Sequence, residues 1–236
     1  MEDLQRKFNE IPPVTKWLCT STFVLTLAGN FGMISPMNLL LFWNPLVQGF
    51  EVWRIITCYL FAGKLGFPFV INLIFLFRHS SQLESLEFRQ RSADYLYFIL
   101  VTCAILAIFG LYFSIPLLSA GLNAAVIYYW SKCFADIEVS FFFGLKFRGQ
   151  YLPWMLLAFN IVMGDVPITQ LLGILASHLF YFFKVTYPAT LRDRNPSQPS
   201  WAESFLDTPW FIKALFAPAI PEGPRPREGV GRRLGE

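Results

Sequence analysis

The stretch YLYFILVTCAILAIFGLYF, from Tyr95 to Phe113, is an unbroken apolar run without a charged residue. A bilayer core is about 30 Å thick, and roughly 20 apolar residues cross it as an α-helix. Backbone polar groups in lipid must be satisfied within the protein, and the run is continuous rather than alternating, which favours a helix over a barrel strand. Tyr95–Phe113 therefore predicts a membrane-spanning helix.

Similar apolar stretches recur along the chain, which is 55% hydrophobic and only 15% charged, an unusual balance for a soluble domain. The expected spans cover residues 17–34, 67–86, 95–113, 115–130, 152–165 and 168–187. The sequence thus predicts an all-α, polytopic membrane protein with six spanning helices. We expect a transmembrane domain over residues 1–190 and a cytosolic tail, largely disordered, over residues 191–236.

Positive charges lie mainly in alternate gaps between these spans. One side of the membrane receives Arg6, Lys7, Lys16, Arg78, Arg89, Arg91, Lys132, Lys146 and Arg148, as well as the basic tail, whereas the first gap holds only Arg54 and Lys64. The positive-inside rule then places both termini in the cytosol, which requires an even number of spans. Because the net charge of +3 arises from this topology, nucleic acid is not an expected partner.

The sequence gives no sign of a cofactor or a metal site. The four cysteines, Cys19, Cys58, Cys103 and Cys133, are isolated and have neither metal-ligand spacing nor the pattern of a disulfide framework. We expect them to be buried, unpaired thiols.

Two of the spans are short for a bilayer. Residues 152–165 would cover only about 21 Å as a helix, and residues 115–130 little more. Either the bilayer thins locally, or the helices extend into flanking polar residues.

Polar residues also recur at membrane depth, and we expect them to point inward. They either line a hydrated interior or form ordinary interhelical hydrogen bonds. These residues are Asn72, Asn123, Asn160, Gln170, Ser177 and His178.

The gap over residues 35–66 is rich in aromatic residues, which predicts a segment in the outer membrane interface. Arg54 either anchors this segment on carbonyls or on a carboxylate such as Glu51, or extends to the surface. In the tail, residues 201–216 have a helix-like aromatic spacing that suits the membrane surface or a partner.

Several motifs resemble the Derlin family, rhomboid-like pseudoproteases of the endoplasmic reticulum. They are IPPVTKW from Ile11, the pair Trp53 and Arg54, NLIFLFRHSSQLE from Asn72, VSFFFGLKFRGQYLPW from Val139, and FLDTPWF from Phe205. The resemblance implies a six-helix rhomboid-like bundle in the endoplasmic reticulum membrane. It also implies that Trp53 and Arg54 set the loop fold, and that Asn72, Asn123, Ser177 and His178 line a polar interior.

Rhomboid proteases need a serine in a Gly-x-Ser-Gly turn on the fourth helix and a histidine on the sixth. His178 matches the histidine, but Ser119 is followed by Ala120 and no serine stands between glycines. Ser177 is adjacent to His178 and so points about 100° away from it. We therefore expect no catalytic residue. Small residues are expected to pack the helices closely instead: Gly121, Ala125, Gly173 and Ser177.

The resemblance implies a non-proteolytic role in degradation from the endoplasmic reticulum, under protein quality control and the unfolded protein response. The chain would help to retrotranslocate misfolded luminal or membrane proteins to the cytosol for ubiquitination and proteasomal degradation. Implied partners are misfolded substrates, a membrane-embedded ubiquitin ligase complex, a cytosolic hexameric AAA ATPase and the lipid bilayer, with a homo- or hetero-oligomer as an option. The alternatives are an active rhomboid-type serine protease and a small-solute transporter.

The end of the tail partially matches the family's short ATPase-binding box. The matching residues are Gly229, Gly231, Arg233 and Leu234. The family box has an aromatic residue ahead of the first glycine, whereas Arg227 and Glu228 stand there in this sequence. This difference removes the apolar anchor on which a short peptide relies for affinity.

Overall fold

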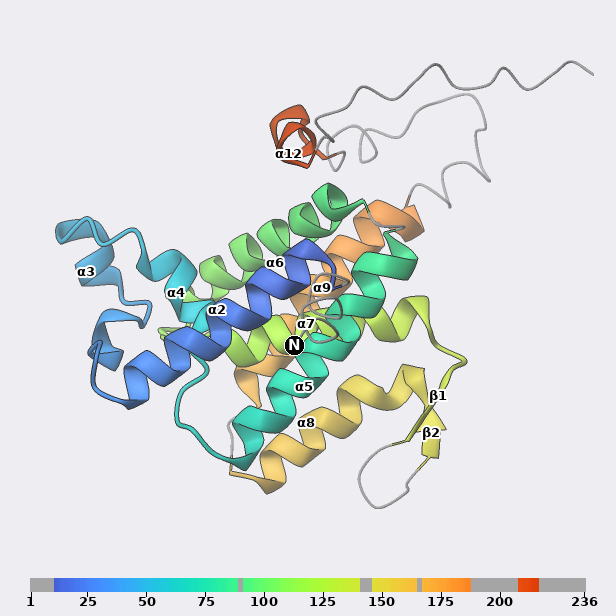
Figure 1. Ribbon diagram of the computed structural model, residues 1–236, viewed down its shortest axis with the longest axis horizontal. Helices are drawn as coiled ribbons and strands as arrows, with labels where there is room; N and C mark the ends of the chain where they lie inside the picture. The colour runs from blue at the N-terminus through green and yellow to red at the C-terminus, as the bar shows by residue number, and fades with distance from the viewer. Residues whose placement is uncertain (1–10, 89–90, 141–145, 165–166, 188–207, 217–236) are drawn as a thin grey trace, which may run out of the picture.

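The computed structural model describes residues 11–88, 91–140, 146–164, 167–187 and 208–216, and this part of the chain is all-α apart from one small hairpin (Figure 1). The main helices are α2 (Pro13–Asn30), α3 (Trp43–Gln48), α4 (Arg54–Leu60), α5 (Phe67–Gln82), α6 (Ser92–Tyr112), α7 (Ser119–Cys133), α8 (Leu152–Val162), α9 (Ile168–Tyr181) and α12 (Trp210–Leu215). Strands β1 (Glu138–Ser140) and β2 (Lys146–Arg148) pair antiparallel between α7 and α8, with Val139 opposite Phe147.

Helix α7 is the centre of the bundle. It packs against α4, α5, α6, α8 and α9, and its residues from Gly121 to Ser131 are buried except for Ala124, which is half-buried. A helix that is covered on all sides by protein does not need to match the thickness of the bilayer. This position explains how a helix of 15 residues can serve as the core of a membrane protein.

Two helices in the described part of the chain are long and apolar enough to cross a membrane by length and composition. They are α6 and the helix that begins at Ile168 and continues through a π-helical turn to Thr186. The other helices of the bundle are shorter or more polar. Helix α5 also continues through a π-helical turn, Leu83–Glu87, while α8 has only 11 residues.

The helix boundaries differ from the expected spans at two main places. Helix α2 begins at Pro13 instead of residue 17, because proline is well suited to the first turn of a helix. Residues 115–118 are not helical, although the fourth span was expected to begin there. Pro116 disfavours helix at the preceding residue, and Ser114 adopts a positive φ of 55°.

The segment before α7 instead binds the first loop. The N–H of Leu41 donates to the carbonyl of Pro116 at 2.9 Å, and the N–H of Leu118 donates to the carbonyl of Cys58 at 3.1 Å. These bonds join the short helices α3 and α4, which lie at one side of the bundle in Figure 1, to the central helix. Residues 115–118 therefore hold the loop that carries α3 and α4 against the start of α7.

Candidate functional site

A cavity of about 580 Å³ opens among α2, α5, α7 and α9. Its wall is largely apolar and includes Leu73, Leu76 and Leu122, but polar side chains from three helices also line it: Asn72, Asn123 and Gln170. A mainly apolar cavity with a few convergent polar groups is the usual form of a binding site. We therefore take this cavity as the candidate site.

Behind the cavity lies a small space of about 20 Å³ between α5, α7, α8 and α9. It is large enough for about one water molecule. Asn72, Asn123 and Gln170 line both spaces, and Asn160 of α8 lines the small one. Four amide side chains from four helices therefore meet in the middle of the bundle.

Two of these amides have an oxygen without a hydrogen-bond partner. Asn123 is 8% exposed and its Nδ2 donates to the carbonyl of Asn72 at 3.2 Å, but its Oδ1 accepts nothing. Asn160 is 5% exposed and its Oδ1 is also unpaired. A buried amide oxygen without a donor costs about 1–3 kcal/mol. These oxygens can therefore accept a hydrogen bond from water or from a bound N–H or O–H group.

His178 and Ser177 do not line either of these two spaces, so the expectation that they share a polar interior with Asn72 and Asn123 stays a prediction. Ser177 is fully buried, with an unpaired hydroxyl. His178 is exposed, and its Nδ1 lies 2.8 Å from the hydroxyl of Tyr128 on α7. The rotation of about 100° between adjacent helical residues turns His178 outward when Ser177 faces inward.

The small residues expected to pack the helices lie where α7 and α9 meet. A Cβ atom placed on Gly173 would lie 2.0 Å from the carbonyl oxygen of Gly121, and one placed on Gly121 would lie 2.9 Å from the carbonyl oxygen of Thr169. The backbones of α7 and α9 are therefore in direct contact. Ala125 and Ser177 are both completely buried, one on each of these helices.

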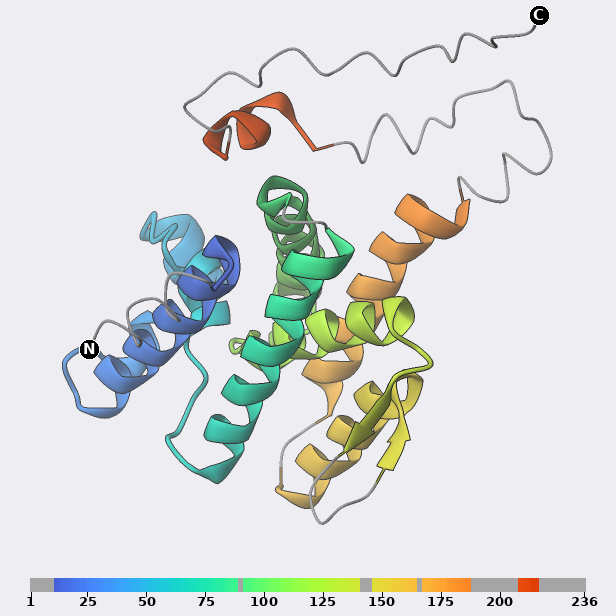
Figure 2. The same cartoon turned by 45° about the vertical axis from the view of Figure 1, so that its right-hand side comes forward.

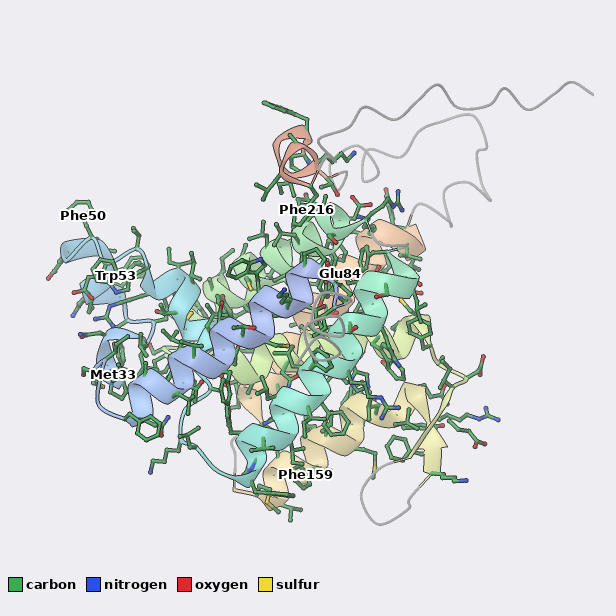
Figure 3. All side chains as sticks on the ribbon, viewed as in Figure 1. Met33, Phe50, Trp53, Glu84, Phe159 and Phe216 are labelled. Atoms are coloured by element: carbon green, nitrogen blue, oxygen red, sulfur yellow. The ribbon has the colours of Figure 1, made fainter. Side chains whose placement is uncertain are left out.

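Arg54 is the polar centre of the first loop. Its side chain is only 5% exposed, and the guanidinium forms an ion pair with Glu51 and donates to the carbonyls of Met37 and Leu40. One side chain thus joins three points of the loop, which the planar donor fork of arginine allows. Trp53, by contrast, is 50% exposed and lies on the outer side of the loop (Figure 3).

A buried hydrogen-bonded chain of polar residues, which the sequence did not predict, lies at the opposite end of α2. Glu84 has no exposed surface and accepts the N–H groups of Val14 and Thr15 at 3.1 and 2.8 Å, and the Thr15 hydroxyl at 2.8 Å (Figure 3). Ser80 lies 2.9 Å from the Thr15 hydroxyl and also contacts the hydroxyl of Tyr95. Because Thr15 donates its single proton to Glu84, Ser80 must donate to Thr15 and Tyr95 to Ser80.

These hydrogen bonds join the motif IPPVTKW, which begins at Ile11, to the end of the motif NLIFLFRHSSQLE, which begins at Asn72, and to the first turn of α6. The carboxylate of Glu84 caps the first turn of α2, where free N–H groups and the helix dipole favour a negative charge. A glutamate 69 residues away in sequence gives no local capping signal, so the sequence did not predict this contact.

The tail contacts the same end of the bundle through α12. The hydroxyl of Thr208 donates to Asp94 Oδ1 at 2.6 Å, and α12 packs against α6. The expected amphipathic segment over residues 201–216 is described only from Thr208, and its helix covers Trp210–Leu215. The expected ATPase-binding residues, Gly229, Gly231, Arg233 and Leu234, lie outside the described residues.

Comparisons with known proteins agree with the motifs. The family model described as the Der1-like family matches residues 11–200. The chain is 37% identical to human Derlin-1 (Homo sapiens) over 90% of this chain and 82% of that protein. It is 35% identical to Derlin-2.1 of Zea mays and to Derlin-2 of Oryza sativa subsp. japonica, over 97% of this chain and 93% of each of those proteins. A mostly helical membrane protein with this sequence similarity along nearly its whole length belongs to the Der1-like family.

Proposed function

We propose that the chain is a non-proteolytic component of endoplasmic-reticulum-associated degradation, which helps to move misfolded luminal or membrane proteins to the cytosol. The observation that carries this proposal is the cavity between α2, α5, α7 and α9, with the unpaired amide oxygens of Asn123 and Asn160 behind it. A polypeptide that crosses a bilayer needs partners for its backbone N–H groups, and these oxygens are suitable acceptors. Membership of the Der1-like family supports the same role.

The proposed topology is a six-span helical bundle in the endoplasmic reticulum membrane, with both termini in the cytosol. The distribution of positive charges supports it. The location of the helix ends also supports it. The hydrogen bonds that link Tyr95, Ser80, Thr15 and Glu84 join the start of α2 to the C-terminal end of α5 and the first turn of α6. Helix α12 contacts the same first turn of α6 through Asp94. The described N-terminal residues and α12 then lie on one side of the membrane.

Proteolysis does not fit the geometry of the helices. His178 is hydrogen-bonded to Tyr128, which lies nine residues beyond Ser119 on α7. Nine residues correspond to about 14 Å along a helix, whereas a serine nucleophile must be within hydrogen-bond reach of its base. The separation along α7 between Ser119 and the residue that His178 contacts supports a non-proteolytic role.

In this role the chain would act with a membrane-embedded ubiquitin ligase complex and a cytosolic hexameric AAA ATPase, alone or as an oligomer. The stretch from Gly229 to Leu234 would recruit the ATPase.

The test measures the half-life of a misfolded membrane protein in cells that lack the chain, after rescue with wild type or with Asn123→Leu combined with Asn160→Leu. The substitutions remove two unpaired oxygens and one hydrogen bond, from Asn123 to the carbonyl of Asn72. We expect the double variant to remain folded but to clear the substrate as slowly as cells without the chain. Thr102→Val is the control, because Thr102 also has a buried unpaired hydroxyl but does not line either cavity.

If full-length substrate is cleared normally without the chain while cleaved fragments disappear, the chain is a protease and the proposal is wrong. If the double variant clears the substrate as well as wild type does, the amide cluster does not act in the transport.

A further inference from the structure

Helix α12 lies at one end of the bundle, next to α6 (Figures 1 and 2). Ile212 is 6% exposed, and Phe216 packs against the core of the bundle (Figure 3). Trp210 and Leu215, on the same short helix, are largely exposed. Elements with few buried contacts open locally at a low free-energy cost, so α12 is expected to detach more readily than the rest of the bundle.

The polar part of this contact is the hydrogen bond from Thr208 to Asp94. Thr208 is 4% exposed, so its hydroxyl is enclosed where it donates to Asp94 Oδ1. The other carboxylate oxygen lies 3.3 Å from Arg91 Nε, and the side chain of Arg91 is 71% exposed. The contact therefore requires a donor at position 208 and has no space for a larger or more negative group.

We propose that Thr208 is a phosphorylation site for a proline-directed protein kinase, and that its phosphorylation detaches α12 from α6. Pro209 follows Thr208 directly, as such kinases require. In the reaction, Thr208 Oγ forms a bond to the γ-phosphorus of ATP and gives its proton to the base of the kinase. The bond from that phosphorus to the bridging oxygen breaks, and ADP leaves.

Charge and volume both make the modified state incompatible with docking. A phosphate group adds a charge of about −1.5 to −2 and removes the hydroxyl proton that Asp94 accepts. Arg91 provides a single positive charge, which the carboxylate already uses. Because Thr208 is enclosed when α12 is docked, the kinase acts on the detached state, and the phosphate then prevents its return.

The consequence concerns the stretch from Gly229 to Leu234, which follows α12 in the chain. With α12 docked, Phe216, the last described residue before this stretch, packs against the bundle, and detachment of α12 releases that contact. Access of a cytosolic kinase rests on the topology proposed above. The structural effect itself does not depend on that topology or on substrate transport.

The experiment measures hydrogen exchange of residues 210–216 in the purified full-length protein in lipid nanodiscs. Thr208→Glu should accelerate exchange by about tenfold, because the added carboxylate faces Asp94. Ala214→Glu, which adds the same charge at an exposed position of α12, should leave exchange unchanged. Thr208→Glu combined with Asp94→Asn should exchange more slowly than Thr208→Glu alone, since the repulsion is removed, but faster than wild type, since the larger side chain remains.

Treatment with a purified proline-directed kinase and ATP, followed by mass spectrometry, tests the modification directly. Phosphate on Thr208 together with fast exchange supports the proposal. Phosphate only at other residues, or equal exchange in Thr208→Glu and wild type, overturns it. Both readouts use isolated protein, so they are distinguishable from a failure of substrate clearance in cells.

Discussion

Glu84 shows how much a single buried charge can matter in this protein. Replacing it with glutamine places an NH₂ group or a weaker acceptor opposite three donors, two of them N–H groups of the first turn of α2. We expect Glu84→Gln to destabilise the fold by about 2 kcal/mol, through a lost cap and an unsatisfied buried group. Thermal unfolding in detergent micelles measures this loss.

The control for that prediction is Glu138→Gln, which removes the same charge at an exposed position of β1. Surface substitutions of this kind usually change stability by less than about 0.5 kcal/mol. Equal unfolding temperatures for Glu84→Gln and wild type would show that the carboxylate does not hold α2 in place.

Gly173 determines how closely α7 and α9 can pack. A methyl group there would overlap the carbonyl of Gly121 at 2.0 Å, and backbone atoms cannot move aside as a flexible side chain can. Gly173→Ala should therefore separate α7 from α9 and destabilise the protein by about 3 kcal/mol. Gly66→Ala is the matched control, because its added Cβ would meet only an ordinary contact at 3.6 Å. Similar unfolding of the two variants contradicts the direct backbone contact.

Among the structural elements, the first loop depends on Arg54. Lysine at this position keeps the charge, but its single ammonium cannot reproduce the arginine fork that joins Glu51 to the carbonyls of Met37 and Leu40. Arg54→Lys should increase hydrogen exchange across residues 35–60, while Trp53→Ala should have a smaller effect because Trp53 is half exposed. A larger effect of Trp53→Ala would mean that the aromatic residue, and not the guanidinium, holds the loop.

The helices themselves show what the sequence could predict. Long continuous apolar runs identified α6 and α9 closely, because a helix in lipid satisfies its backbone hydrogen bonds within its own segment. Gly121 and Gly173 were expected among the small residues that pack the helices, but the sequence did not predict that they contact each other. The start of α7 was predicted too early, since hydropathy does not distinguish a helix from an extended apolar segment such as residues 115–118.

The candidate site was less predictable than the helices. Asn72 and Asn123 were expected inside because of their depth, and they line the cavity. His178 was expected beside them, but which face of a helix points inward depends on its packing partner. The role of Glu84 depends on a contact between residues far apart in sequence, which no local pattern encodes.

For the whole molecule, the difference in helix length has a consequence for the membrane. Helix α6 has 21 residues and spans about 31 Å, whereas α8 has 11 residues and spans about 17 Å. Helix α7 is also short, but protein surrounds it. Trp154, Ile161 and Val162 of α8 are exposed. In the proposed six-span topology this helix would face lipid, and the bilayer would have to compensate for its shortness.

We therefore expect the protein to be most stable in thin bilayers. Mismatch costs a fraction of a kcal/mol per Å, so resistance to unfolding should fall from dimyristoyl through dioleoyl to dierucoyl phosphatidylcholine vesicles. A series with constant acyl chains and varied headgroups is the control that separates thickness from surface charge. Equal stability in all three lipids would mean that α8 does not meet the hydrocarbon core, and that local thinning plays no part in moving a polypeptide across this membrane.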